Sequence, residues 1–61
     1  MPVVTIQMYE GRTREQKAEL AQRITDAVVE VARTTEDHVW IVFEDKKKSD
    51  WSIAGKLQDE G

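Results

Sequence analysis

Two β-rich segments enclose one amphipathic segment, and this order limits the possible folds more than any other feature of the sequence. Val3–Tyr9 alternates apolar and polar residues, and Val39–Phe43 is a continuous apolar run, so each is a predicted strand. Two strands joined through a helix need a crossover connection, for which a right-handed parallel pairing is the default. The sequence therefore predicts an α+β fold built on a β-α-β unit.

The segment between the strands has the pattern of one long helix. Thr13-Arg14-Glu15-Gln16 predicts a capping box, in which the Thr13 and Gln16 side chains each bond the other residue's backbone N–H. We expect the helix to run from about Arg14 to Arg33 and to end in a polar loop over Thr34–Asp37. Its apolar stripe is predicted to consist of Leu20, Ile24, Ala27, Val28 and Val31.

The last part of the chain is less regular. Trp51, Ile53 and Leu57 stand among polar residues, and Gly55 suits a turn. We expect a short C-terminal hairpin or arm.

A chain of 61 residues is expected to form a single domain over residues 1–61 and to bury only about 60% of its unfolded surface. It has no cysteine, and its one histidine, His38, cannot hold a metal alone, so we expect neither disulfides nor a metal site. One helix covers one face of a two-stranded sheet, and the other face would carry Val3, Trp40 and Val42. The chain is therefore expected to oligomerise through its sheet and helix faces.

Charge and hydropathy exclude several function classes. The formal net charge is −3, which argues against a nucleic-acid partner bound by phosphate neutralisation. A ribbon-helix-helix DNA binder also opens with a strand, but it needs a second helix where Val39–Phe43 is β-branched and aromatic. No apolar run approaches the roughly 18 residues of a membrane span, and Met1–Arg12 lacks a signal-peptide core. We expect a cytoplasmic protein with no membrane partner.

The chain resembles the 4-oxalocrotonate tautomerase family over nearly its whole length. The matching segments are Pro2-Val3-Val4, Glu10-Gly11-Arg12-Thr13, Glu15-Gln16-Lys17, Val39–Glu44 and Trp51-Ser52-Ile53-Ala54-Gly55-Lys56. The resemblance implies dimers with a four-stranded sheet and a homo-hexamer built as a trimer of dimers. It also implies an isomerase that moves a proton in the enol or dienol form of a 2-keto acid, a small-molecule substrate, without a cofactor.

Pro2 is the expected catalytic residue. Methionine aminopeptidases remove Met1 before a small residue such as proline, which would leave a secondary amine at the start of a strand. A general base works best when its pKa lies near the working pH, and a free α-amino group has a pKa of about 8. Apolar surroundings, here expected from Trp51, and a nearby cation, here Arg12, both lower that pKa. The alternative is that Pro2 only opens an edge strand.

Arg12 is implied by the resemblance to bind the substrate carboxylate through two hydrogen bonds of its planar guanidinium. The alternative is an arginine at a helix start that pairs with Glu10 or Glu15. Tyr9 either lines the site or packs between subunits.

Trp40 stands where members of the family carry a second arginine, which binds the other end of a dicarboxylate. Trp40 is expected either to form a wall for a substrate with an aromatic or apolar end, or to pack in an interface. A dicarboxylate such as 2-hydroxymuconate then lacks its second anchor, unless a lysine replaces it; the candidates are Lys46, Lys47, Lys48 and Lys56. The same substitution suggests an alternative function, a non-catalytic or partner-dependent subunit of a mixed hexamer.

Overall fold

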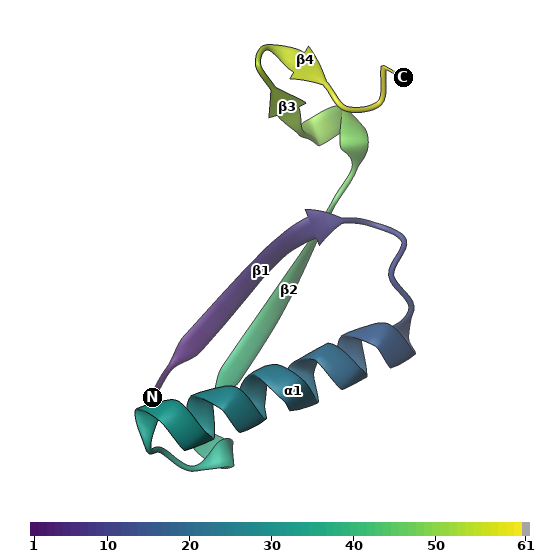
Figure 1. Cartoon of the computed structure of the whole chain (residues 1–61). Helices are drawn as coiled ribbons and strands as arrows, with labels where there is room; N and C mark the ends of the chain where they lie inside the picture. Colours follow the sequence, from purple (N-terminus) through teal and green to yellow (C-terminus); the bar gives the residue numbers. More distant parts are fainter. Residues whose placement is uncertain (61) are drawn as a thin grey trace.

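The structure, a computed structural model, describes residues 1–60 and shows a β-α-β unit followed by a small hairpin (Figure 1). Strand β1 spans Val3–Tyr9, helix α1 spans Arg14–Ala32 and strand β2 spans Trp40–Lys46. Two short 3-10 turns, η1 (Glu36–His38) and η2 (Lys48–Asp50), precede β2 and the hairpin. The hairpin consists of β3 (Ser52–Ile53) and β4 (Lys56–Leu57). The predicted α+β class is confirmed.

Strands β1 and β2 pair in parallel, as predicted, with Val3 opposite Trp40 and Tyr9 opposite Lys46. β2 continues three residues beyond the predicted end at Phe43. It does so because Glu44–Lys46 pair with the second half of β1, and the Glu10 N–H then donates to the Lys46 carbonyl at 2.9 Å. The two strands are therefore equally long, with seven residues each.

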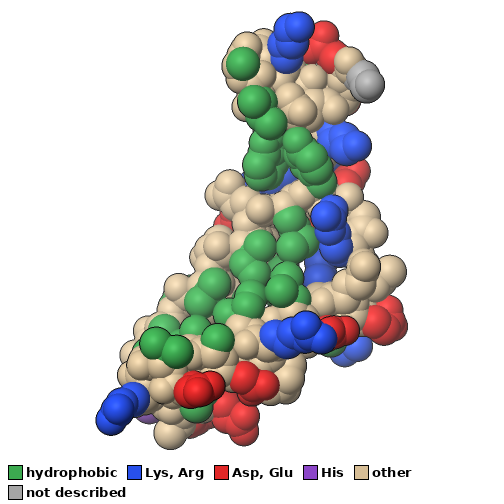
Figure 2. All heavy atoms as spheres, viewed as in Figure 1, with side chains coloured by type: hydrophobic (Ala, Val, Ile, Leu, Met, Phe, Trp, Pro, Cys, Tyr) green, Lys and Arg blue, Asp and Glu red, His purple; other side chains and the backbone are tan. Residues whose placement is uncertain are grey.

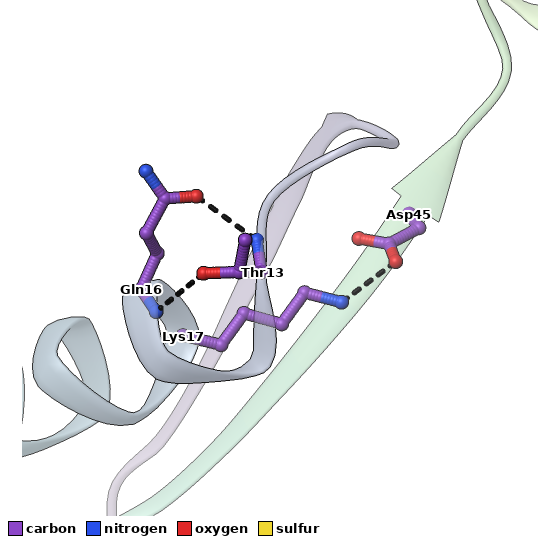
Figure 3. Close-up of polar contacts among 4 residues, drawn as sticks. All are labelled: Thr13, Gln16, Lys17 and Asp45. Atoms are coloured by element: carbon purple, nitrogen blue, oxygen red, sulfur yellow. Dashed lines mark hydrogen bonds and ion pairs between the residues drawn. The ribbon is translucent and has the colours of Figure 1, made fainter.

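Helix α1 begins with the predicted capping box (Figure 3). The Gln16 N–H donates to Thr13 Oγ1 at 3.1 Å, and the Thr13 N–H donates to Gln16 Oε1 at 2.9 Å. The helix ends at Ala32, one residue before the predicted end, because Arg33 adopts a left-handed conformation with φ 56°. The predicted exit loop is partly helical, since its last residues form η1.

The helix face turned to the sheet differs from the predicted stripe. Leu20, Ile24 and Val28 are half-buried as predicted, but Ala27 and Val31 are exposed, Val31 by 80%. The half-buried face extends instead to Ala21, Thr25 and Val29. A two-stranded sheet covers only one flank of the stripe, and the other flank stays open to solvent.

The outer face of the sheet, away from α1, is uncovered. Val3 is 54% exposed, Trp40 54% and Val42 46%, whereas the alternate residues Ile41 and Phe43 are half-buried. On the side from which α1 is seen in front of β2, Figure 2 shows a further band of apolar side chains open to solvent. Within residues 1–60 no side chain is fully buried. A single chain therefore leaves one face of its sheet without a partner, as the sequence predicts.

The C-terminal hairpin, predicted as a short hairpin or arm, lies beyond the C-terminal ends of β1 and β2 (Figure 1). Its turn, Ala54-Gly55, has positive φ at both residues, 53° and 82°, as tight two-residue hairpins require. The Gln58 N–H donates to the Trp51 carbonyl at 2.9 Å and closes the arm on itself. The projecting arm contributes to a radius of gyration of 14.5 Å, against about 10.5 Å expected for a compact domain of this length.

No helix among the described residues is long and apolar enough to cross a bilayer.

Candidate active site

Pro2 and Trp40 lie at one end of the sheet. Pro2 is half-buried directly before β1, and its carbonyl accepts a hydrogen bond of 3.0 Å from the Trp40 N–H. Met1 is 73% exposed. The two residues are therefore joined through their backbones, while the Trp40 side chain lies on the uncovered outer face. Thr35 lies in the turn that precedes β2. Its hydroxyl donates to Asp37 Oδ1 at 2.6 Å, and this hydrogen bond lowers the pKa of the Asp37 carboxyl below its ordinary value.

Tyr9 and Trp51 lie at the other end of β1. Their ring centroids are 5.0 Å apart with an interplanar angle of 70°, an edge-to-face contact. The Lys48 ammonium lies 5.6 Å from the Tyr9 centroid, within the range of a cation–π contact. Because Tyr9 ends β1 and Trp51 begins the arm, this cluster fastens the arm to the sheet.

Arg12 lies in the turn between β1 and α1, one residue before the Thr13 cap. The turn depends on Gly11, whose φ of 119° disfavours a side chain. Arg12 is exposed and borders an open hollow of about 420 Å³ between β1 and the first turns of α1. The hollow is lined by Met8, Arg12, Gln16, Lys17, Glu19, Leu20 and Arg23.

No ion pair among residues 1–60 involves Arg12. Near it, Lys17 Nζ pairs with Asp45 Oδ2 at 2.6 Å, which fastens α1 to β2 (Figure 3), and Arg23 pairs with Glu19. The alternative of a helix-start arginine held by Glu10 or Glu15 is therefore not what the structure shows. Among residues 1–60 the guanidinium has no acidic partner and can donate to another acceptor.

One chain does not bring Pro2 and Arg12 together. They flank β1 at opposite ends, and a strand of seven residues rises roughly 23 Å. Pro2 and Trp40 lie at one end of the sheet, whereas Arg12 and Trp51 follow its other end and line separate hollows there. The predicted effect of Arg12 on the Pro2 amine needs a second chain.

The sequence does not distinguish Lys48 from the three other candidate lysines and allows two roles for Tyr9, but the structure places Lys48 over the Tyr9 ring. No pattern in the sequence identifies their contact, because it depends on how the arm folds back toward the end of β1. No group of three or more His, Asp or Glu side chains in residues 1–60 is arranged to hold a metal ion.

The chain matches the family described as "Tautomerase enzyme" over residues 2–60. It is 42% identical over 60 residues to a probable tautomerase of Ralstonia nicotianae, covering 98% of this chain and 92% of the relative. It is 41% identical over 56 residues to the 2-hydroxymuconate tautomerase of Bacillus subtilis, covering 92% and 90%.

Two solved structures support the same assignment. A crystal structure of a homologue of 4-oxalocrotonate tautomerase matches with a TM-score of 0.94, 37% identity and 98% coverage of both chains. A heterohexamer 4-oxalocrotonate tautomerase from Chloroflexus aurantiacus matches with a TM-score of 0.91 and 30% identity, covering 98% of this chain and 97% of that one. This likeness in sequence and fold supports an isomerase activity of the tautomerase type. The chain belongs to the tautomerase family, with homologues of 4-oxalocrotonate tautomerase as its structural neighbours.

Proposed function

We propose that this chain, once Met1 is removed, is a tautomerase that converts the enol of a 2-keto acid to the keto form, with Pro2 as general base and acid. The observation that supports it most is the division of the site residues between the two ends of β1. The exposed Met1 is open to an aminopeptidase, and Pro2 behind it is half-buried. Arg12, which has no ion pair among residues 1–60, offers its guanidinium to a carboxylate.

Two chains can complete one site. β1 lies at an edge of a two-stranded sheet, so its outer edge has free backbone groups within one chain. If two β1 strands pair antiparallel about a two-fold axis, the Pro2 end of each lies beside the Tyr9 and Arg12 end of the other. Such a pairing forms a four-stranded sheet. Its uncovered outer face would then pack on further dimers, in a cytoplasmic homo-hexamer.

In the proposed reaction the Pro2 nitrogen takes the hydroxyl proton of the enol. The O–H electron pair becomes the new C=O π bond, and the C=C electrons accept a proton at carbon from the Pro2 ammonium. No atom or electron is gained or lost overall. Arg12 of the second chain holds the carboxylate and draws electron density toward it, and Trp51 of that same second chain excludes water so that the pKa of the amine is lowered.

The test compares wild type and Pro2→Ala by intact mass and by ultraviolet assay of ketonisation. The wild-type mass should lack one methionine, and kcat/KM in Pro2→Ala should fall about 10²- to 10⁴-fold, the usual share of general acid–base catalysis. Both proteins should elute with the same size in gel filtration. Equal rates in the two proteins would defeat the mechanism.

A second candidate is a non-catalytic or partner-dependent subunit of a mixed assembly. One observation favours it: the structural neighbour from Chloroflexus aurantiacus, which matches over 98% of this chain, is a heterohexamer. Turnover by this chain purified alone would remove this candidate.

A further inference from the structure

The turn that carries Arg12 is held at its ends rather than along its length. It runs from Glu10 to Thr13, between β1 and α1. Apart from the chain neighbours of Gly11, no atom of residues 1–60 lies within 4 Å of the position that a Gly11 Cβ would occupy. Glycine also has more backbone freedom than any other residue. The position of Arg12 therefore depends on how the two ends of the turn are fixed.

Strand β2 anchors both ends of this turn. At the start of the turn, the Glu10 N–H donates to the Lys46 carbonyl at 2.9 Å. At its end, the Thr13 carbonyl accepts a hydrogen bond of 3.1 Å from the Lys17 N–H, and Lys17 Nζ pairs with Asp45 Oδ2 at 2.6 Å (Figure 3). The two ends of the turn are thus held by consecutive residues of one strand.

The ion pair is the contact that fixes the first turn of α1 to the sheet. Within residues 1–60, no other side-chain hydrogen bond or ion pair joins α1 to β1 or β2. Lys17 is also the first residue of the helix that is not exposed, and the half-buried apolar face begins only at Leu20. Loss of the pair would therefore free the first turn of α1 to move relative to β2.

Arg12 and Lys17 border the same hollow as Met8, and Met8 stands opposite Asp45 in the parallel ladder. We infer that Lys17 and Asp45 are a positioning pair for Arg12. By fixing the first turn of α1 to β2, they hold the guanidinium where both of its hydrogen bonds to a carboxylate can form. The inference rests on the proposed function, in which Arg12 binds the substrate carboxylate.

The test measures carboxylate binding without turnover. The probe is sorbate, a monocarboxylate with no enol hydroxyl, and its dissociation constant is measured by NMR titration of the assembled, processed protein. Asp45→Ala removes the acceptor of the pair. Loss of one of the two hydrogen bonds of the guanidinium corresponds to about a tenfold change in affinity, so sorbate should bind about three- to tenfold more weakly in this variant. A partly exposed pair adds little stability, so the thermal melt should stay close to that of wild type.

Glu44→Ala is the matched control. Glu44 precedes Asp45 in β2, its side chain is also 39% exposed, and its ion pair with Lys46 stays within the strand. Removal of a negative charge by itself favours an anionic ligand, so this variant should bind sorbate no more weakly than wild type. For the same reason, weaker binding in Asp45→Ala would not come from the change in charge.

A charge exchange tests the link between the helix and the sheet. The double variant Lys17→Glu with Asp45→Lys restores an ion pair between α1 and β2, whereas Asp45→Lys alone places two cations together. The double variant should bind sorbate more tightly than Asp45→Lys, although it carries less positive charge. Weaker binding in the double variant would contradict a role for the pair itself.

Arg12→Ala separates a positioning role from a general structural one. If the pair acts through Arg12, Asp45→Ala should cause no further loss of sorbate affinity in the Arg12→Ala background. Equal losses in both backgrounds, or no loss in the wild-type background, would overturn the inference. If Arg12→Ala itself left sorbate binding unchanged, the carboxylate role of Arg12 would fail and the inference with it. The turnover assay of Pro2→Ala tests the base separately, because sorbate has no hydroxyl proton to transfer.

Discussion

Replacement of Arg12 by alanine separates a binding role from a structural one. Arg12 is exposed and has no ion-pair partner within residues 1–60, so Arg12→Ala should change the free energy of unfolding by no more than about 0.5 kcal/mol. If its guanidinium binds the substrate carboxylate through two charge-assisted hydrogen bonds, the loss is about 3 kcal/mol at about 1.5 kcal/mol each. That corresponds to a fall of roughly 100-fold in kcat/KM, carried mainly by KM.

The assay is steady-state ketonisation of an enol acid, run beside a thermal melt of the same samples. Arg14→Ala is the matched control, because Arg14 is also exposed, has no ion pair among residues 1–60 and lies two residues along the chain, in the first turn of α1. Arg12→Lys keeps the charge but loses the planar fork, and should fall between alanine and wild type. The reasoning is refuted if Arg12→Ala has wild-type kinetics, or if Arg14→Ala is impaired as strongly.

Two further predictions concern the outer face and the turn before β2. Trp40→Asp places a carboxylate beside Val42 on the uncovered face, and we expect light scattering after gel filtration to show smaller species; an unchanged mass would contradict the use of this face in assembly. Thr35→Val removes the 2.6 Å hydroxyl donor, so the pKa of Asp37 should rise toward its ordinary 3.8 in a carboxyl NMR titration. Because the pKa of Asp37 in the folded protein lies below its value in the unfolded chain, this hydrogen bond stabilises the fold at a pH above the unfolded pKa. The stabilisation is lost as the pH falls through the folded pKa. An unchanged titration of Asp37 in Thr35→Val would refute the assignment.

Local signals were sufficient for most of the fold. The alternation of Val3–Tyr9, the capping box at Thr13 and the glycine of the hairpin turn each act within a few residues, and each is confirmed. The end of β2 and the exposure of Val31 were not predicted correctly. Both depend on where β1 and α1 lie relative to β2, which no short window of sequence specifies.

The candidate site was less accessible to the same reasoning. Pro2 and Arg12 could be named one at a time, yet their separation follows from β1 being a straight strand between them. The contact of Lys48 with Tyr9 depends on the path of the chain after β2, because Lys48 stands 39 positions beyond Tyr9. The sequence allows two roles for Trp40, a wall of the substrate site or packing in an interface. Its 54% exposure in one chain is compatible with both roles.

Because no side chain in residues 1–60 is fully buried, the fraction of this protein that is folded should depend on its concentration. A chain that acquires its hydrophobic interior from its neighbours obeys mass action, so its melting temperature should climb as the sample is concentrated and drop on dilution. Below a threshold concentration of the chain, most copies would then be unfolded and open to proteolysis. Above that concentration, association would keep them folded and protected.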